Sequence, residues 1–548
     1  MTALVLGPLL RYVGRDERGG NATVWVEVDG PCEVTVLGCT TRAFEVSGHW
    51  FALVVVTGLP TAADTAYGVA LDGEPVWPLP GSSWPPSLIR TREDDETLSL
   101  AFGSCRVAGP LDDPTSGVDA LHALAERMRG QEPAQWPHEL LLLGDQVYAD
   151  ENISPDTKDF IEGRRDTTVG AGSEVADVEE YTRLYLESWS PAPVRWLLST
   201  VPTAMVFDDH DVRDDWNTST TWRMSMQATD WWQGRIEAGL MTYWLYQHLG
   251  NLSPADLASN GLLAELQRGG DGEPALRAYA RKADAAVDGS GRNHWSFRRD
   301  LGDVRLVVLD SRCGRVLSPD RREMLDEQEW AWLEQQLEGS YDHLLLGTSV
   351  PYLLPPGVHG LEAFDEAIAE GVWGPRAARL GEKLRQGADL EHWAAFGASF
   401  ARMSDLLAEV GSRPDAPETI TFLSGDVHFA YLAQARFPGR PEVTSKLFQA
   451  VCSPIRNPLP RGMQYGQRAA CSRALGRVGQ WLQKAARVDP PELVWQVEGG
   501  PAFGNEIATL VLDGRGARLD VESAQPGPRL DRSFSHVLST APDRVPVA

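Results

Sequence analysis

Six short apolar runs, each ending in a polar signature, constrain the fold of this chain more than any other feature. They span residues 98–105, 139–145, 204–210, 304–310, 343–349 and 419–426. Helical patterns lie between them, for example over residues 118–129 and 326–337. Continuous apolar strands are typical of sheets buried on both faces, so the sequence predicts an α/β fold. Because ligands bind at the carboxyl ends of such strands, the functional site is expected there.

Residues 1–92 have a different pattern, which predicts a small all-β domain. Runs over 22–29, 32–37, 51–56 and 66–71 have strand character and are joined by turn signals such as Asp72-Gly73. We expect an immunoglobulin- or fibronectin-like β-sandwich, followed by a linker over 78–86. The second predicted domain covers 93–548. It includes helical insertions at about 215–300 and 355–390, and it returns to strands near the C-terminus.

The charge of the chain restricts its partners. Its 548 residues include 77 acidic and 50 basic side chains, which leaves a net charge of −27. This balance argues against a nucleic acid or an anionic membrane as a partner and favours a small-molecule substrate. No apolar run is long enough to span a bilayer, and the first residues lack the features of a signal peptide. With six cysteines and no CxxC pair, the expected location is the reducing cytoplasm. The oligomeric state stays open.

Side chains able to bind metals follow several of the predicted strands. Each has an ordinary explanation when taken alone: a cysteine can be a small apolar residue, an aspartate can cap a helix, and a histidine can be a satisfied core residue. Their common position at strand ends makes a shared metal site the better hypothesis. The residues are Cys105, Asp145, Tyr148, Asp209, His210, Asp426 and His428.

Three segments resemble the alkaline phosphatase D (PhoD) family of metallophosphoesterases: Gly144-Asp-Gln-Val-Tyr-Ala-Asp150, Phe207-Asp-Asp-His-Asp-Val212 and Ser424-Gly-Asp-Val-His-Phe429. Further matching motifs occur in family order at 102–105, 201–202, 310–312 and 452–454. The resemblance implies a metallophosphoesterase-type β-sandwich core flanked by helices. It also implies a metal-dependent phosphoric ester hydrolase, either a phosphomonoesterase or a phosphodiesterase. In this class a metal-bridging hydroxide attacks phosphorus in line.

The resemblance also implies roles for the individual ligands. Asp145 would be the bridging carboxylate. Cys105, Tyr148 and His428 would complete one metal site, and Asp209 and Asp426 would help hold the other. Thiolate, phenolate and imidazole suit a transition metal, whereas carboxylates suit a hard cation. We therefore expect a dinuclear or larger centre with Fe3+ and Ca2+, and Mn2+, Mg2+ and Zn2+ remain alternatives.

Other residues near the motifs have two possible roles each. His210 either contacts the phosphate, acting in catalysis together with Asp145, or holds a neighbouring carboxylate. Arg106 either binds the phosphate or forms a structural ion pair. One further ligand is expected within an oxygen-rich group: Asp211, Asp214, Asp215 and Asn217.

Two alternative functions remain at this stage. A catalytically silent metal-binding scaffold would be expected to lack one or more donors, whereas every motif position here carries one. A thiol hydrolase would instead use Cys105 as its nucleophile and would need a histidine base that does not bind metal.

Overall fold

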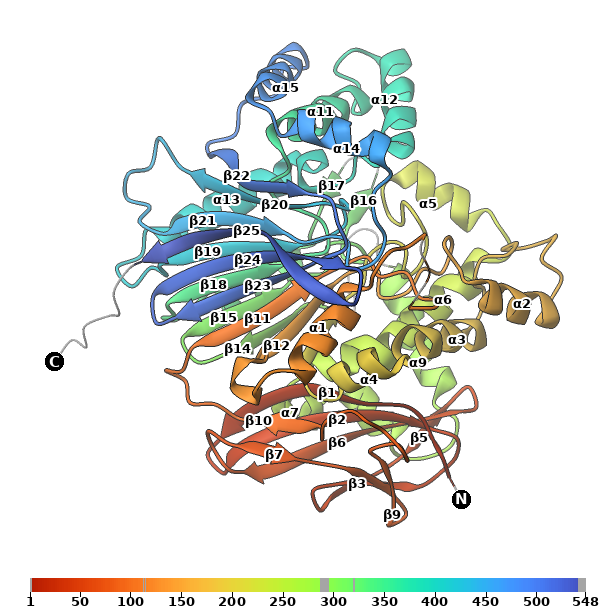
Figure 1. The fold of residues 1–548 in the computed structure, drawn as a ribbon. Helices are drawn as coiled ribbons and strands as arrows, with labels where there is room; N and C mark the ends of the chain where they lie inside the picture. The colour runs from red at the N-terminus through yellow and green to blue at the C-terminus, as the bar shows by residue number, and fades with distance from the viewer. Residues whose placement is uncertain (1, 112, 114, 286–294, 319–320, 541–548) are drawn as a thin grey trace.

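Two large mixed β-sheets form the centre of the molecule (Figure 1). The computed structural model describes residues 2–111, 113, 115–285, 295–318 and 321–540. The six-stranded sheet has the order β13 (Thr203–Val206), β12 (Glu139–Leu143), β11 (Leu98–Gly103), β23 (Glu506–Asp513), β24 (Gly516–Gln525) and β25 (Arg529–Thr540). The seven-stranded sheet has the order β14 (Phe297–Asp300), β15 (Val304–Val308), β18 (His343–Gly347), β19 (Thr419–Ser424), β21 (Lys446–Val451), β20 (Ala430–Arg436) and β22 (Val494–Ala502).

The inner faces of the two sheets bury one another. Leu100 and Leu141 of the first sheet belong to the same apolar core as Leu306 and Leu345 of the second. Strands β11, β12 and β13 are parallel, and so are β15, β18, β19 and β21. Each of the six apolar runs in the sequence forms one of these parallel strands. The parallel arrangement brings their carboxyl ends to common edges, which is where the sequence places its polar signatures.

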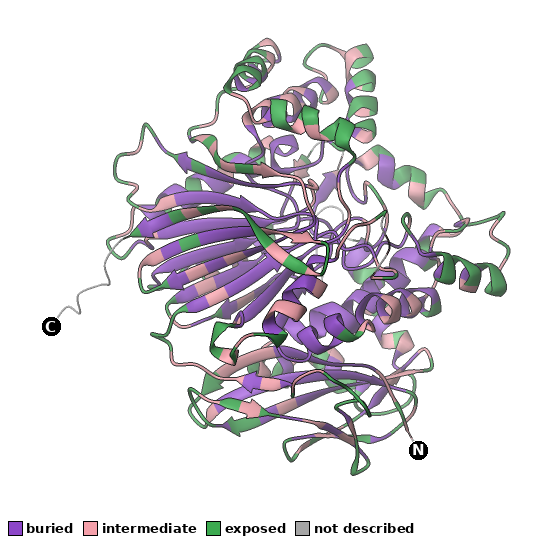
Figure 2. Cartoon of the chain, in the orientation of Figure 1, coloured by how far each residue is buried: buried purple, intermediate pink, exposed green. Residues whose placement is uncertain are grey.

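Helices pack on the outer face of each sheet and form a four-layered core, while β25 is largely exposed (Figure 2). The six-stranded sheet is covered by α1 (Ala120–Arg129), α3 (Val178–Trp189), α4 (Ala192–Leu198), α6 (Trp232–Thr242) and α9 (Glu273–Ala285). The seven-stranded sheet is covered by α10 (Glu327–Gln336) and α13 (Gly397–Gly411). This β-sandwich between helices confirms the predicted metallophosphoesterase-type fold class.

The N-terminal region is all-β, as predicted. One sheet has the order β1 (Leu4–Asp16), β2 (Gly19–Val28), β6 (His49–Leu59) and β5 (Phe44–Val46). The other has the order β4 (Cys39–Arg42), β3 (Glu33–Val36), β8 (Val69–Leu71) and β9 (Glu74–Trp77), and β7 (Asp64–Ala66) pairs with β10 (Leu88–Arg90). The first sheet packs on the large domain. Trp25 lies 5.2 Å from Tyr246, ring centre to ring centre, within an apolar core that both regions share.

The remaining helices lie mostly in the two predicted insertions. The first insertion contains α5 (Thr220–Gln227), α6, α7 (Pro254–Ser259), α8 (Gly261–Leu266) and α9, and its residues 286–294 lie outside the described part. The second contains α11 (Pro356–Ala369) and α12 (Pro375–Gly387). Elsewhere are α2 (Pro155–Arg164), α14 (Arg461–Ala470), α15 (Arg473–Ala485) and the short strands β16 (Val316–Ser318) and β17 (Arg321–Glu323). Among the helices described, none is both long and apolar enough to cross a membrane.

Candidate metal centre

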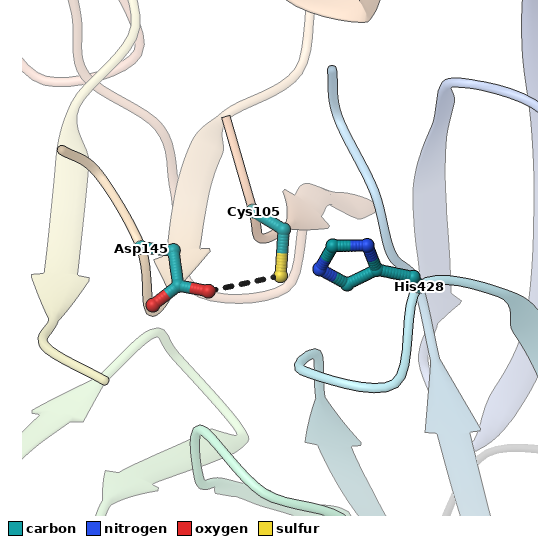
Figure 3. Close-up of side chains that lie close together, drawn as sticks. All are labelled: Cys105, Asp145 and His428. Atoms are coloured by element: carbon teal, nitrogen blue, oxygen red, sulfur yellow. Dashed lines mark hydrogen bonds between the residues drawn. The ribbon is translucent and has the colours of Figure 1, made fainter. Parts of the chain in front are cut away.

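The predicted metal ligands come together in loops at the carboxyl ends of four strands. Cys105 follows β11, Asp145 follows β12, and Asp209 follows β13, all in the six-stranded sheet. Asp426 and His428 follow β19 in the facing sheet. The Cys105 Sγ–H donates to Asp145 Oδ2 at 3.3 Å, and the His428 ring lies beside them (Figure 3). Residues more than 300 positions apart in sequence therefore share one site.

Four of these ligands have a left-handed backbone conformation. Cys105, Asp145, Asp426 and His428 have φ values of 58°, 52°, 69° and 57°. The left-handed region is uncommon for residues other than glycine, and the surrounding structure must hold them there. The strained turns direct the four side chains toward one another.

Two glycines allow the loops to approach closely. A Cβ on Gly144, whose φ is 103°, would lie 2.6 Å from Asp208 Cβ. A Cβ on Gly425 would lie 1.9 Å from Ser104 Oγ, and that hydroxyl accepts a hydrogen bond from the Asp426 N–H. At these two contacts, the loops after β11, β12, β13 and β19 are therefore packed without room for another side-chain atom.

Three groups of donors overlap at the site. Each has its ligand atoms within 4.8 Å of one another: Cys105, Asp145 and His428; Asp145, Asp209 and His210; Asp208, Asp209 and Asp426. Asp145 and Asp209 each belong to two groups, so the donors form a continuous chain rather than separate sites. Tyr148 joins them, with its hydroxyl 3.5 Å from Asp145 Oδ2 and its ring stacked 4.7 Å from that of His210.

Burial determines the protonation of Cys105 and His428. It raises the pKa of the Cys105 thiol to about 12, so the thiol keeps its proton until a cation displaces it. Burial, with the nearby His210, lowers the pKa of His428 to about 4 and leaves a neutral imidazole, the form that binds metals. A thiol this well buried and protonated argues against Cys105 as a nucleophile.

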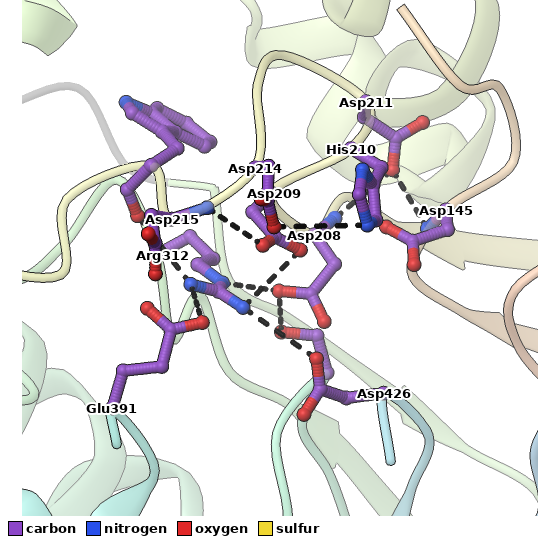
Figure 4. A network of polar contacts seen from close by, with 12 residues as sticks. Asp145, Asp208, Asp209, His210, Asp211, Asp214, Asp215, Arg312, Glu391 and Asp426 are labelled. Carbon is purple, nitrogen blue, oxygen red and sulfur yellow. Dashed lines mark hydrogen bonds and ion pairs between the residues drawn. The ribbon is translucent and has the colours of Figure 1, made fainter. Parts of the chain in front are cut away.

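A buried arginine partly neutralises the carboxylates, and sequence reasoning did not assign it to the site. Arg312 is fully buried, and its guanidinium contacts Asp208, lies 3.3 Å from Asp209 and 3.6 Å from Asp426, and pairs with Glu391 at 2.5 Å (Figure 4). The motif at 310–312 was the available signal.

Two further residues, Asp150 and His392, hold side chains of the site in place and were also missed as functional residues. His210 Nδ1 lies 3.0 Å from Asp150 Oδ1, which fixes the orientation of the imidazole. His392 Nε2 lies 2.6 Å from Asp426 Oδ2, and its Nδ1 lies 2.6 Å from Glu362 Oε1. Asp150 stands within the 144–150 motif, whereas His392 stands in none and could not be found by its spacing.

Arg106 lies beside Cys105 in the sequence, but its side chain is engaged elsewhere. Its guanidinium is buried, pairs with Asp119 at 2.7 Å and donates to the Ser188 carbonyl at 2.7 Å. These contacts favour the structural ion pair over the predicted phosphate contact, which no observation supports.

The oxygen-rich group that was expected to contain a further ligand divides in two. The Asp211 carboxylate accepts backbone N–H bonds from Asp145 and Asp208, both at 2.9 Å, and Asn217 hydrogen-bonds Arg223 and Arg312. These two residues support the loops. Asp214 lines the cavity, and Asp215 Oδ1 is buried without a hydrogen-bond partner, so these two remain candidates.

The donors open into a cavity of about 770 Å³. Its lining includes His210, His428 and a large number of carboxylates: Asp145, Glu151, Asp209, Asp214, Glu362, Asp389, Glu391 and Asp426. Loop residues 457–460 and two side chains of α14, Met463 and Gln467, form another part of the wall.

The chain is similar to several known proteins and family models. A domain of unknown function, DUF7800, matches residues 1–89. A solved structure of PhoD is similar with a TM-score of 0.57 and 12% identity, over 98% of this chain and 93% of that one. A purple acid phosphatase, PPD1 from yellow lupin (Lupinus luteus) seeds, gives 0.47 and 10%, over 96% and 73%. No curated protein matches the chain. The model of the PhoD-like phosphatases matches residues 121–475, more than half of the chain, and the protein therefore belongs to the PhoD-like phosphatase family.

Proposed function

We propose that this protein is a metal-dependent phosphoric ester hydrolase that acts on small phosphomonoesters or phosphodiesters. The observation that carries the proposal is the overlap of the three donor groups through Asp145 and Asp209. An arrangement of this kind suits two neighbouring cations that share a carboxylate. The membership of the PhoD-like phosphatase family supports the same reaction class.

The residues present fit a metal centre. Asp145 Oδ1 is a buried side-chain oxygen without a hydrogen-bond partner, and a buried polar atom without a partner is costly. We infer that Cys105, Tyr148 and His428 hold Fe3+ with Asp145, and that Asp209 and Asp426 hold Ca2+, with Mn2+, Mg2+ or Zn2+ as alternatives. When bound, such cations polarise the phosphoryl oxygens and supply hydroxide near neutral pH.

His210 is the proposed acid of the reaction. Burial lowers its pKa, but Asp150 and Asp209 outweigh that effect and hold the pKa well above its usual value. The imidazolium lines the cavity and is oriented through Nδ1 by Asp150. Its position suits donation of a proton to the leaving alkoxide.

The charge of the cavity makes the cations necessary for substrate binding. Its wall contains many carboxylates and few cationic side chains, so it would repel a phosphate ester.

A catalytically silent scaffold is disfavoured, since each predicted ligand position keeps a donor. Six scattered cysteines without a CxxC pair fit a reducing compartment, and we propose the cytoplasm.

The first experiment compares wild type, Asp145→Ala and Asp166→Ala, the last as a control on a fully exposed loop carboxylate. Bound metals are measured by mass spectrometry, and turnover is measured with p-nitrophenyl phosphate and bis-p-nitrophenyl phosphate. Even residues that only support a ligand cost 10–100-fold, so we expect Asp145→Ala to lose metal and more than about 100-fold in kcat/KM. Full metal content and turnover in Asp145→Ala would refute the assignment.

A further inference from the structure

One segment of this acidic chain is basic. Residues 443–488 contain eight arginine or lysine residues and no aspartate or glutamate, in a chain whose net charge is −27. Helices α14 and α15 lie within this segment. Six of its cations are exposed and form no ion pair with any described residue: Arg461, Arg468, Arg473, Arg477, Lys484 and Arg487.

The same two helices expose large apolar side chains. Met463 is 57% exposed, Tyr465 72% and Trp481 67%, and Leu475 and Val478 are exposed beside them. Four further exposed apolar residues lie on or just before α12: Val372, Trp373, Leu380 and Leu384. Nine of the fifteen exposed large apolar residues in the described chain therefore lie in these three helical segments, and both α12 and α15 pack on α11. Single exposed apolar residues are normal, but such a concentration marks an interaction surface.

The packing of α15 explains why its apolar residues face outward. The helix buries its glycines, and a Cβ on Gly360 of α11 would lie 2.4 Å from Gly479 Cα. A surface helix usually turns its large apolar residues to the core. Here the glycines face α11, and Val478 and Trp481 are exposed to solvent. The outer sides of α15 and α12 are the exposed parts of this region in Figure 2.

We propose that α14 and α15 dock on the surface of an anionic lipid bilayer. Tryptophan, tyrosine and aliphatic side chains insert at the boundary between headgroups and acyl chains, and arginine and lysine extend their charged ends to anionic headgroups. A bilayer accepts separate projecting side chains that form no complementary groove. A symmetric dimer through this face would place six unpaired cations against the same six cations of the second copy, which disfavours it.

The net charge of the chain does not oppose this docking. Charges farther from the bilayer than the Debye length of about 8 Å are largely screened, so the lipid responds to the local patch. The expectation of no membrane partner rests on the summed charge of the chain, whereas the proposed docking depends on the local charge of α14 and α15. Because Met463 and Gln467 of α14 also line the cavity, docking would bring the bilayer close to the candidate metal centre.

Flotation of the full chain with vesicles tests the proposal. We expect binding to phosphatidylcholine vesicles that contain about 30% phosphatidylglycerol in buffer of about 0.1 M salt, and loss of binding near about 1 M salt. Pure phosphatidylcholine vesicles should bind far less. The variant Arg473→Gln/Arg477→Gln/Lys484→Gln should bind about 100-fold more weakly, at roughly fivefold per cation. Val478→Ala/Trp481→Ala should also weaken binding.

A matched variant distinguishes this patch from general charge effects. Arg18→Gln/Arg42→Gln/Arg268→Gln removes the same charge from exposed positions elsewhere and should bind as wild type does. An unchanged Tm shows that the variants are folded. The proposal is overturned by absence of flotation, by equal loss in both triple variants, or by equal binding to neutral vesicles. It is also overturned if light scattering shows a dimer that only the patch variant disrupts. Flotation is measured without turnover, so its outcome is independent of the proposed reaction.

Discussion

A single histidine outside every motif positions a candidate metal ligand. His392 is buried between Glu362 and Asp426, 2.6 Å from an oxygen of each. We expect His392→Gln to leave Asp426 free to turn away, because glutamine cannot bridge both carboxylates as a cation. Loss of such a supporting residue weakens metal affinity or activity by about 10–100-fold. Metal retained after dialysis and kcat/KM check this expectation.

The control for this prediction is a histidine away from the centre. His122 lies on α1, 3.9 Å from Glu126, and touches none of the candidate ligands. His122→Gln should keep both metal content and turnover. If His392→Gln behaves in the same way, the contact with Asp426 has no role in holding the ligand.

At the residue scale, the candidate metal ligands could be predicted from the sequence, whereas the residues that hold them in place could not. Cys105 and Asp145 follow apolar strands, so their position could be inferred from the strand pattern alone. His392 reaches the site from a distant segment, where no local pattern indicates burial beside a carboxylate. Arg106 shows the reverse case, because a residue adjacent to a ligand in sequence can point its side chain toward a different partner.

The loops that follow the strands need glycine at particular points. Gly144 has a φ of 103°, and a Cβ there would lie 2.6 Å from Asp208 Cβ. We expect Gly144→Ala to lower stability by about 1–3 kcal/mol through strain and to displace the loop that carries Asp145. A displacement of about 1 Å can cost about 100-fold in rate. We therefore expect a loss of up to about 100-fold in kcat/KM together with a measurable fall in Tm.

Another glycine in an open loop provides the comparison. A Cβ on Gly439 would have no neighbour within 4 Å, and its φ lies outside the left-handed region. Gly439→Ala should therefore match wild type in Tm and kcat/KM. Equal behaviour of the two alanine variants would show that the loop after β12 has more freedom than its geometry indicates.

At the element scale, the sequence predicted strands and helices better than their arrangement. Apolar runs and their polar ends identified six parallel strands, because that pattern depends on burial, which is local to each strand. The pairing of β11 with β23 joins segments about 400 residues apart. The approach of the loop after β19 to the six-stranded sheet, which brings His428 to Cys105 and Asp145, depends on how two sheets face each other. Neither feature has a local signal.

At the scale of the whole molecule, the N-terminal sandwich and the large domain form one packed unit. Arg11 of β1 is buried, and its guanidinium donates to the backbone carbonyls of Thr203 at 2.9 Å and Tyr246 at 2.5 Å. The sequence pattern predicted a separate domain followed by a linker. A change of pattern along the chain marks a domain boundary, but it does not reveal that apolar faces on its two sides pack against each other. His49 of β6 adds a titratable contact, with Nδ1 3.0 Å from Glu27 and Nε2 2.9 Å from Glu179 of α3.

This contact makes the stability of the molecule depend on pH. The hydrogen bond to Glu27, and then that to Glu179, outweigh burial and raise the pKa of His49 to about 9 from its ordinary value of 6.5. The stability that His49 contributes, at most about 3 kcal/mol, is therefore fully present below pH 6.5 and is lost as the pH rises through 9. Partial exposure of the ring reduces this figure through solvent screening. We expect the Tm of wild type to fall across this range and His49→Gln to show a smaller fall, with His536→Gln following wild type. Parallel Tm curves for wild type and His49→Gln would show that the contact does not couple protonation to docking of the sandwich.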